Sequence, residues 1–455
     1  MNKRPYFHFT PDSNWMNDPN GLSYYKGEFH LFYQHNPKNC YWGNMTWGHA
    51  KSKDLFNWEH LPYALNPDSK VFGDIDGCFS GSAIVEHDEL ILFYTGVEMK
   101  TKKLNEFGNV VTVGSNDLIP SQILAKSIDG INFKKVQKLS LELPKSYCQS
   151  HVRDPKVWRK DGIWYLVIGA KEDYQGRILI YKSKDMKKWQ LLSIIKEENM
   201  GYMWECPDLF KIDDTDILLF SPEGIGTDGQ VSISGYYTGK FNYENGEFKH
   251  NSFERLDYGF EFYAPQTFVD CNKRRILIGW LVNHAPLPNE NWTGLMTLPR
   301  EIKIKNGKVY MYPVEELKKY RIEELVEFSQ LKSTSNTFDF EVTFKNLDNF
   351  KILLFKDNNN GLSLTYSSFD KKLILNRENV INGFKPLETF GTIRECQIDG
   401  EKECTLRIIV DKCVAEIYIN NGEKVMSCVV NPTSNQENVE VIGNIISKKI
   451  YKLNK

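Results

Sequence analysis

Three acidic residues stand in short segments that suit neither a helix nor a regular strand: Asp18 in NDPNG, Asp154 in RDP and Glu205 in WECP. Burying a carboxylate beside proline, tryptophan or cysteine is costly unless the carboxylate is paired or used. Each of the three, taken alone, could be structural, and Asp18 could be only a turn former. Their shared setting makes all three candidates for catalytic groups.

A pair of carboxylates that face one bond is the usual apparatus for cleaving a glycoside, through an oxocarbenium-like transition state. One carboxyl must then hold a proton while the other is ionised. Glu205 follows Tyr202, Met203 and Trp204, and partial desolvation together with a nearby carboxylate would raise its pKa. This setting predicts a general acid at Glu205.

The two aspartates suit the ionised roles. Asp18 follows Asn17 in a predicted tight turn, whose amide groups can hydrogen-bond an ionised nucleophile. Asp154 follows Arg153, whose charge would keep the aspartate ionised so that it stabilises developing positive charge. For a retaining enzyme the carboxyls of Asp18 and Glu205 should lie about 5 to 5.5 Å apart, whereas about 9 Å would indicate inversion.

The elements that would position these residues are strands. Short apolar and aromatic runs alternate with Gly, Asn and Asp turn signals, and long helical periodicity is nearly absent. Examples of such runs are EFHLFYQ, ELILFYTG, IWYLVIGA and DILLFSP. The pattern predicts an all-β chain.

Internal repeats organise these strands. Three segments end alike, with KSKDLFNW from Lys51, KSIDGINF from Lys126 and KSKDMKKW from Lys182, and we interpret each as an outer strand, a turn and an aromatic residue. Five segments also open alike, with a polar or proline-containing start, a strand, a turn and another strand. The landmarks in these openings are Asp18, Ser80, Asp154, Glu205 and Gln266.

The spacing of the landmarks predicts the architecture. They are separated by 62, 74, 51 and 61 residues, near the upper end of the lengths of propeller blades, so we predict a five-bladed β-propeller. The first strand of each blade lines the central channel, and residues that open the repeats should therefore meet at one end of the axis. This geometry favours a shared function for Asp18, Asp154 and Glu205.

The rest of the chain predicts a second domain. At 455 residues the chain is longer than one hydrophobic core usually supports, and the landmarks stop near Tyr312. We predict a propeller over residues 1–312, a short helical linker over 313–327 and a β-sandwich over 328–455. The sandwich presents no catalytic constellation, so we expect a structural role, and a contact with substrate or a partner subunit is left open.

Composition limits the partners. The formal charge of −2, from 57 basic and 59 acidic residues, gives no electrostatic reason to expect nucleic acid or an anionic membrane. The nine cysteines form no CxxC pair and no Cys/His cluster at zinc spacing, which favours free thiols. We expect neither a metal nor a cofactor. The N-terminus has no apolar signal segment, which predicts a cytoplasmic protein.

GIGTDG from Gly224 satisfies the dinucleotide-binding pattern GxGxxG, but a predicted strand follows it where dinucleotide binding needs a helix.

NDPNG, FSGSA, RDP and WECP, in this order, resemble the signature motifs of glycoside hydrolase family 32, which contains invertases, fructan hydrolases and sucrose-6-phosphate hydrolases. The similarity covers nearly all of residues 5–315. It implies a five-bladed propeller with a β-sandwich, retention of configuration, Asp18 as nucleophile, Glu205 as acid/base and Asp154 as transition-state stabiliser. It also implies that the fructosyl unit contacts Asn17, Gln34, Trp42, Phe79, Ser80, Arg153 and Trp280.

The resemblance also bears on the substrate. GYMWECPDLF, LDYGFEFYAPQTF and LMTLPRE are similar to the bacterial sucrose-6-phosphate hydrolase branch, and a cytoplasmic enzyme would meet sucrose that was phosphorylated during import. We therefore expect cleavage of sucrose 6-phosphate, with intracellular invertase and fructan hydrolase activities as alternatives. An inverting arabinanase or xylosidase should lack the joint NDPNG and WECP pattern, and a non-catalytic binding propeller would not need three carboxylates.

Overall fold

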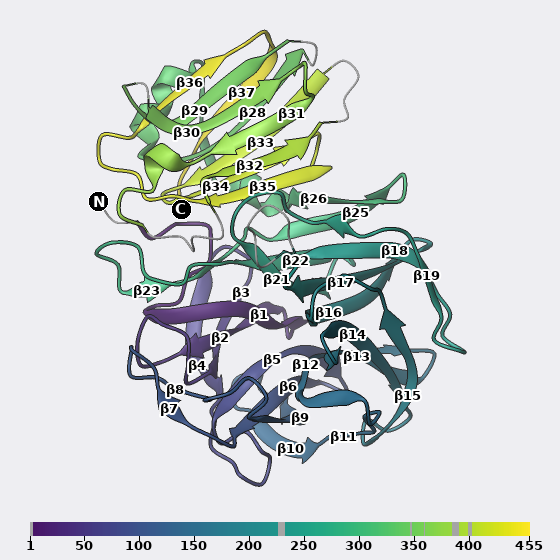
Figure 1. Cartoon of the computed structure of the whole chain (residues 1–455). Coiled ribbons are helices and arrows are strands. Elements are labelled where there is room, and N and C mark those ends of the chain that lie inside the picture. The colour runs from purple at the N-terminus through teal and green to yellow at the C-terminus, as the bar shows by residue number, and fades with distance from the viewer. Residues whose placement is uncertain (1–2, 226–232, 346–347, 359, 385–390, 399–402) are drawn as a thin grey trace.

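The computed structural model describes residues 3–225, 233–345, 348–358, 360–384, 391–398 and 403–455. Five sheets surround a central axis in the lower body of Figure 1, and two further sheets form a sandwich above them. The predicted all-β fold, a five-bladed β-propeller followed by a β-sandwich, is confirmed. The GIGTDG segment lies mostly outside the described residues.

Each propeller sheet has four main antiparallel strands, counted outward from the axis. The innermost are β1 (Asn14–Tyr25), β5 (Gly77–Glu86), β12 (Tyr147–Lys160), β16 (Met203–Ile212) and β21 (Phe262–Val269). The second are β2 (Glu28–Asn36), β6 (Glu89–Met99), β13 (Ile163–Glu172), β17 (Thr215–Glu223) and β22 (Arg275–Leu281). All five sequence landmarks lie in innermost strands, as predicted.

The outer strands complete the blades. The third are β3 (Thr46–Ser52), β9 (Leu118–Ser127), β14 (Gln175–Ser183), β18 (Gly235–Phe241) and β25 (Arg300–Lys305). The fourth are β4 (Trp58–Leu65), β10 (Lys134–Lys138), β15 (Lys188–Lys196), β19 (Phe248–His250) and β26 (Lys308–Pro313). Short additional strands are β7 (Lys103–Leu104), β8 (Val110–Val111), β11 (Ser140–Leu141), β20 (Glu254–Arg255), β23 (Trp292–Thr293) and β24 (Leu295–Met296).

The ring of blades is closed by backbone hydrogen bonds between distant parts of the chain. β23 pairs in parallel with the start of β1, and the Asn14 N–H donates to the Asn291 carbonyl at 2.7 Å. Each innermost strand contacts the innermost strands of the two neighbouring blades, so β21 of the last blade meets β1 of the first. Closure removes exposed sheet edges around the axis and fixes the five landmark strands relative to one another.

The three repeated segment endings form the same turn between a third and a fourth strand. In each turn an aspartate carboxylate accepts hydrogen bonds from the backbone N–H groups two and three residues further on, and these aspartates are Asp54, Asp129 and Asp185. The next residue has positive φ in all three turns, at Leu55, Gly130 and Met186. The prediction of a strand, a turn and an aromatic residue is confirmed at these sites.

The sandwich consists of two antiparallel sheets. One holds β27 (Arg321–Leu325), β37 (Ile445–Leu453), β28 (Thr337–Lys345), β33 (Glu403–Asp411), β34 (Val414–Ile419) and β35 (Lys424–Val429), in that order. The other holds β32 (Ile393–Gln397), β31 (Lys372–Asn376), β30 (Asn360–Ser367), β29 (Phe350–Asp357) and β36 (Asn438–Ile442).

The segment predicted as a linker, residues 313–327, contains two ordered elements. The 3-10 helix η1 (Glu315–Tyr320) is followed by β27, which pairs with β37 and so extends a sandwich sheet. Two more 3-10 helices, η2 (Phe328–Thr334) and η3 (Glu378–Val380), lie in the sandwich. No helix within the described ranges has the length and apolar character needed to cross a membrane.

The sandwich docks on the fifth blade through backbone and charged groups. The N–H groups of Tyr258 and Phe260 donate to the carbonyls of Val425 and Ser427 at 2.8 and 2.9 Å. Gly259 permits this approach, because a Cβ at that position would lie 2.0 Å from the Ser427 carbonyl oxygen. Backbone hydrogen bonds therefore join the two domains at this boundary.

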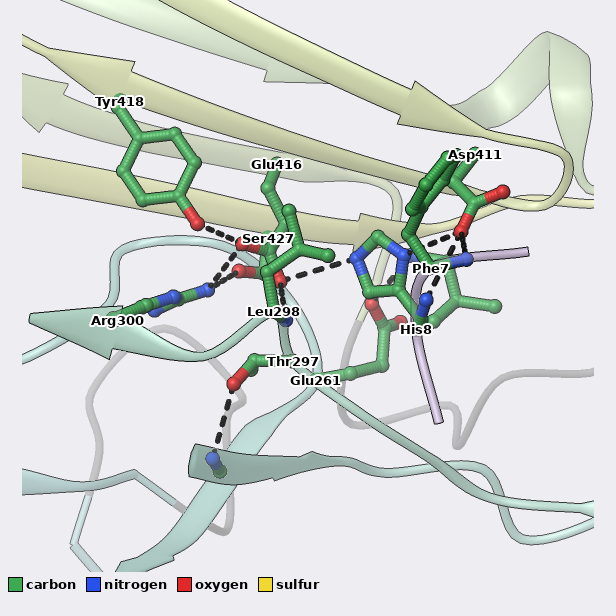
Figure 2. A network of polar contacts seen from close by, with 12 residues as sticks. Phe7, His8, Glu261, Thr297, Leu298, Arg300, Asp411, Glu416, Tyr418 and Ser427 are labelled. Atoms are coloured by element: carbon green, nitrogen blue, oxygen red, sulfur yellow. Dashed lines mark hydrogen bonds and ion pairs between the residues drawn. The ribbon is translucent and has the colours of Figure 1, made fainter. Parts of the chain in front are cut away.

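A buried charge network crosses the same boundary (Figure 2). His8, from the N-terminal segment, lies between Asp411 at 2.9 Å and Glu416 at 3.3 Å, and Arg300 of β25 contacts Glu416 at 3.2 Å. Burial alone would lower the pKa of His8, but hydrogen bonds to Asp411 and Glu416 and their negative charges outweigh burial and raise the pKa to about 9. The charged histidine joins the propeller to the sandwich.

Replacing His8 with Gln should destabilise the protein by about 3–5 kcal/mol below pH 6.5, because Asp411 and Glu416 would lose a buried cationic partner. A histidine whose folded pKa is about 9 contributes stability that is fully present below its unfolded value of about 6.5 and is lost as pH rises through 9. The midpoint of thermal unfolding, measured from pH 6 to 10, should fall for the native chain and converge with that of the variant. If the unfolding midpoints of the native chain and the variant stay the same distance apart from pH 6 to 10, the charge of His8 does not stabilise the fold. His87→Gln, at an exposed turn, is the control.

Candidate active site

A cavity of about 480 Å³ opens where the innermost strands begin. Its wall includes residues from the first halves of β1, β5, β12, β16 and β21, so the strands that open the five repeats meet there. All ten residues predicted from the sequence line this one cavity: Asn17, Asp18, Gln34, Trp42, Phe79, Ser80, Arg153, Asp154, Glu205 and Trp280. Among the described residues, none of those lining it belongs to the sandwich.

Each innermost strand is irregular at its landmark. The pairing with the second strand shifts between Met16 and Pro19 in β1, and equivalent shifts occur in β5, β12, β16 and β21. Asp154 has φ +69° and Cys206, next to Glu205, has φ +49°. A bulge adds a residue to one strand and re-aims side chains, so these irregularities turn the three carboxylates toward the axis.

The Asp18 carboxylate is held by three donors. The Ser80 hydroxyl donates to Oδ2 at 2.6 Å, the Asn17 amide donates to Oδ1 at 3.2 Å, and the Cys206 thiol lies 3.6 Å from Oδ2. Asn17 is in turn fixed by the Trp15 indole N–H at 2.7 Å. These contacts leave the carboxylate one defined orientation in the cavity.

Asp154, from the innermost strand of the third blade, is held through backbone groups. Its carboxylate accepts the Cys206 N–H at 3.0 Å, and its own N–H donates to the Thr95 hydroxyl at 3.0 Å. Thr95 donates to Gln122 at 2.7 Å, so the second blade supports this strained residue. Cys206 thus contacts both aspartates, with Sγ 3.8 Å from Asp154 Oδ2.

Glu205 has the strongest donors in the cavity. Arg153 Nε donates to Glu205 Oε1 at 2.8 Å, and its Nη2 forms an ion pair with the same oxygen at 2.8 Å. The Tyr263 hydroxyl donates to Oε2 at 2.6 Å. The guanidinium lies 3.4 Å from a further carboxylate, that of Glu223 at the end of β17. Arg153 therefore serves two glutamates.

These contacts correct the pKa values expected from the sequence. Burial alone would raise the pKa of Glu205, but the Arg153 charge and hydrogen bonds from Glu223, Tyr263 and Arg153 outweigh burial and lower it. Burial and the Glu205 charge raise the pKa of Asp154 to about 7 and also raise that of Asp18. The expected raised pKa of Glu205 and low pKa of Asp154 were both wrong, because the Arg153 side chain reaches Glu205 on the next blade. Its positive charge therefore lowers the pKa of Asp154 less than its position next to Asp154 in the sequence suggested.

Aromatic residues and a glutamine complete the predicted wall. Trp42 is 42% exposed at the rim and packs edge-on against Phe79 at 6.2 Å, whereas Trp280 is buried against Trp15 at 5.8 Å. The Gln34 amide donates to the Ser80 hydroxyl at 3.2 Å. The rim can therefore offer a flat apolar surface to a sugar ring, and the floor offers polar groups.

Several lining residues were not singled out by the sequence. Tyr263 and Glu223 contact the glutamate and arginine described above, and Tyr202, which was expected only to desolvate Glu205, has a hydroxyl that hydrogen-bonds Glu223. Glu223 directly follows the apolar run DILLFSP, which predicts a second strand of a blade. An acidic residue at the end of such a strand was the only feature of the sequence that could have indicated a site residue there. His151 also lines the cavity, and burial lowers its pKa to about 4.

The comparisons with known proteins agree with this geometry. Residues 8–313 match the N-terminal domain of glycosyl hydrolases family 32, and residues 313–452 match the C-terminal domain of that family. The chain belongs to glycosyl hydrolase family 32, and the protein is a glycoside hydrolase.

Similar proteins match along nearly the whole chain. The Escherichia coli sucrose-6-phosphate hydrolase is 35% identical over 94% of this chain and 89% of its own length, and the Bacillus subtilis sucrose-6-phosphate hydrolase is 35% identical over 93% and 88%. The solved sucrose-6-phosphate hydrolase from Lactobacillus gasseri superimposes with a TM-score of 0.89 at 26% identity, covering 99% of this chain and 93% of that one. A Bombyx mori GH32 β-fructofuranosidase, a mutant solved in complex with sucrose, gives 0.81 at 32% identity, covering 100% and 94%.

Replacing Ser80 with Ala should move the acidic limb of the pH profile of glycoside hydrolysis to higher pH. The Ser80 hydrogen bond lowers the pKa of Asp18, so its loss raises that pKa, and an ionised Asp18 is then available only at higher pH. About one pH unit is expected, the size of one hydrogen bond to a charged group. Ser82→Ala, whose hydroxyl donates to the Pro155 carbonyl, is the control, and an unshifted limb in Ser80→Ala would count against the contact.

Proposed function

We propose that the protein is a retaining β-fructofuranosidase that hydrolyses sucrose 6-phosphate to fructose and glucose 6-phosphate in the cytoplasm. The proposal is carried by one observation: three candidate carboxylates from separate blades line a single cavity in a family 32 chain. It is supported by the Escherichia coli and Bacillus subtilis relatives named sucrose-6-phosphate hydrolase, which match over 94% and 93% of this chain. Sucrose, as in an intracellular invertase, and fructans remain the alternative substrates to be tested.

The proposed mechanism consists of two displacements. Glu205 protonates the glycosidic oxygen while Asp18 attacks C2 of the fructosyl unit, and Glu205 then takes a proton from the water that releases fructose. Asp154 holds fructosyl hydroxyls and stabilises the positive charge that develops on the sugar. The donors on Asp18 support its role, because Ser80 and Asn17 orient the carboxylate from opposite oxygens.

The remaining predicted residues are assigned as sugar contacts. We propose that Asn17, Gln34, Ser80 and Arg153 hydrogen-bond the fructosyl unit, which is supported by their polar atoms on the cavity wall, and that Trp42, Phe79 and Trp280 enclose it. We also propose a propeller over residues 1–312 and a sandwich over residues 328–455, and β27 of the segment between them adds an edge strand to one sandwich sheet.

A phosphate on the glucosyl unit needs a cation beyond those that hold the carboxylates. Among the described residues that line the cavity, Arg153 is the only lysine or arginine, and two glutamates engage it. Lys171 of β13 lies beside Tyr202 of the cavity wall, with Nζ 5.6 Å from the centre of the Tyr202 ring and 5.2 Å from that of Tyr174. It forms no ion pair within the described part of the chain. We therefore assign phosphate recognition to Lys171.

Replacing Asp18 with Asn should abolish hydrolysis, because an amide cannot form the covalent fructosyl intermediate. A loss of at least about 10⁴-fold in kcat is expected, on the scale seen when an essential nucleophile is removed. Thermal unfolding and circular dichroism should be nearly unchanged, since the amide still accepts from Ser80. Full activity with intact folding would leave the cavity with only a sugar-binding role.

Replacing Lys171 with Gln should lower kcat/KM for sucrose 6-phosphate about tenfold or more, the cost of one charge-assisted contact, and leave kcat/KM for sucrose unchanged. Lys187→Gln, at an exposed turn outside the cavity, is the matched control. Steady-state rates on sucrose 6-phosphate, sucrose and a short inulin should show a native preference for the phosphorylated sugar. If the native enzyme prefers sucrose or inulin, the assignment of sucrose 6-phosphate as the substrate is wrong. If Lys171→Gln loses activity equally on sucrose 6-phosphate and sucrose, the assignment of phosphate recognition to Lys171 is wrong.

A further inference from the structure

Glu223 lies beside the proposed acid/base and has no part in the two displacements described above. It ends β17, and in the pairing of β16 with β17 Glu205 stands opposite Ser221 while Glu223 stands opposite Met203. Residues two positions apart across an antiparallel pair are diagonal neighbours on one face of the sheet. Glu223 is therefore within reach of Glu205 because of the strand register.

The two glutamates share their donors. Arg153 lies 2.8 Å from Glu205 Oε1 and 3.4 Å from Glu223 Oε1. The remaining groups that face them are the Tyr263 hydroxyl on Glu205, at 2.6 Å, and the Tyr202 hydroxyl, which hydrogen-bonds Glu223. Neither phenol carries a charge at neutral pH, so one cation stands against two carboxyls.

The wider cavity makes a second negative charge on this pair unfavourable. Its described lining contains four carboxyls, those of Asp18, Asp154, Glu205 and Glu223, and Arg153 as the only lysine or arginine. The lining histidines, His151 and His284, add no charge at neutral pH, since burial lowers the pKa of both, to about 4 for His151. Like charges in a desolvated site cannot all ionise, and the glutamate pair therefore retains a proton between its two members.

The shared proton resides on Glu223 in the free enzyme. Burial and the Glu205 charge raise the pKa of Glu223 to about 8, while the stronger donors of Glu205 lower the pKa of Glu205. Glycoside cleavage, however, needs a proton at Glu205. A carboxylate that is ionised at rest must gain a proton before it can act as the acid, and the neighbouring Glu223 carboxyl is placed to supply it.

We propose that Glu223 holds the proton that Glu205 delivers to the glycosidic oxygen, and that the pair acts as one acid/base unit organised by Arg153. This inference rests on the proposed role of Glu205. Glu223 is a positioning residue here, because it acts on the leaving group only through Glu205.

The proton balance closes over one turnover. In the first displacement a proton passes from the Glu223 carboxyl to Glu205, and from Glu205 to the oxygen of the departing sugar; the pair is then fully ionised and faces Arg153. In the second displacement Glu205 removes a proton from the attacking water and returns it to Glu223. One proton leaves with the alcohol and one arrives from water, so no further reactant is needed.

The test compares substrates that do and do not need a proton on the leaving group. We would measure kcat/KM, which reports the first displacement, on sucrose and on 4-nitrophenyl β-fructofuranoside for the native enzyme and for Glu223→Gln. An amide cannot store the proton, so the variant should lose about 10²-fold or more on sucrose, the usual contribution of general acid catalysis. It should lose less than about threefold on the nitrophenyl glycoside, whose leaving group departs as an anion.

The pH profile gives a second readout that a merely structural role would not move. Without the Glu223 carboxyl, the acid/base unit gives up its proton at a lower pH. The alkaline limb of kcat/KM on sucrose should therefore shift to lower pH by at least about one unit. Glu223→Asp keeps a carboxyl at shorter reach and should shift the limb in the same direction by a smaller amount. This variant also tests the proposal if Glu223→Gln fails to fold.

Two results would overturn the inference: equal losses on both substrates, or an unshifted alkaline limb in both Glu223 variants. Glu205→Gln separates the inference from the function on which it rests, because it should show the same dependence on the leaving group. If Glu205→Gln lacks that dependence, the proposed function itself fails. Glu247→Gln, in an exposed turn before β19, is the matched control and should behave as the native enzyme.

Discussion

The Arg153 guanidinium is the charge on which the cavity depends. Four carboxyls line a largely buried space whose only described lysine or arginine is this one, and the energy of placing them together falls when a cation stands at 2.8 Å from one and 3.4 Å from another. Because the guanidinium is planar and carries several donors, it can hold two glutamates in fixed directions at once. The position of this one positive charge then decides which carboxyls in the cavity are ionised and which keep a proton.

The propeller supplies the geometry that such a charge arrangement requires. Arg153 belongs to β12, Glu205 to β16 and Glu223 to β17, so the contacts span two blades and would be lost if either moved. Closure of the ring by β23 on β1, and docking of the sandwich on the fifth blade, restrict that movement. Bulges at each landmark then turn the side chains toward the axis, at the cost of local backbone strain at Asp154 and Cys206. The closed ring and the docked sandwich thus hold the strained backbone at Asp154 and Cys206 in place.

The sequence predicted the parts of this arrangement that depend on repetition. Strand periodicity and the spacing from Asp18 to Gln266 were sufficient for the number of blades and for the convergence of the three carboxylates, since those follow from chain order. The partners of each carboxylate did not follow from chain order. Arg153 precedes Asp154 in the sequence but donates to Glu205, because a bulge separates the directions of neighbouring side chains. Glu223 carries no motif, and its place beside Glu205 arises from strand register, which the sequence pattern did not specify.

The most direct test of the account is the stereochemistry of transfer to methanol. If Asp18 forms a covalent fructosyl intermediate and Glu205 activates the acceptor on the same face, hydrolysis of sucrose in aqueous methanol should give methyl β-D-fructofuranoside, identified by ¹³C NMR as the first methyl glycoside formed. Formation of the α anomer would mean a single displacement with inversion. That result would contradict both the nucleophilic role of Asp18 and the separation of about 5 to 5.5 Å expected between the two carboxyls.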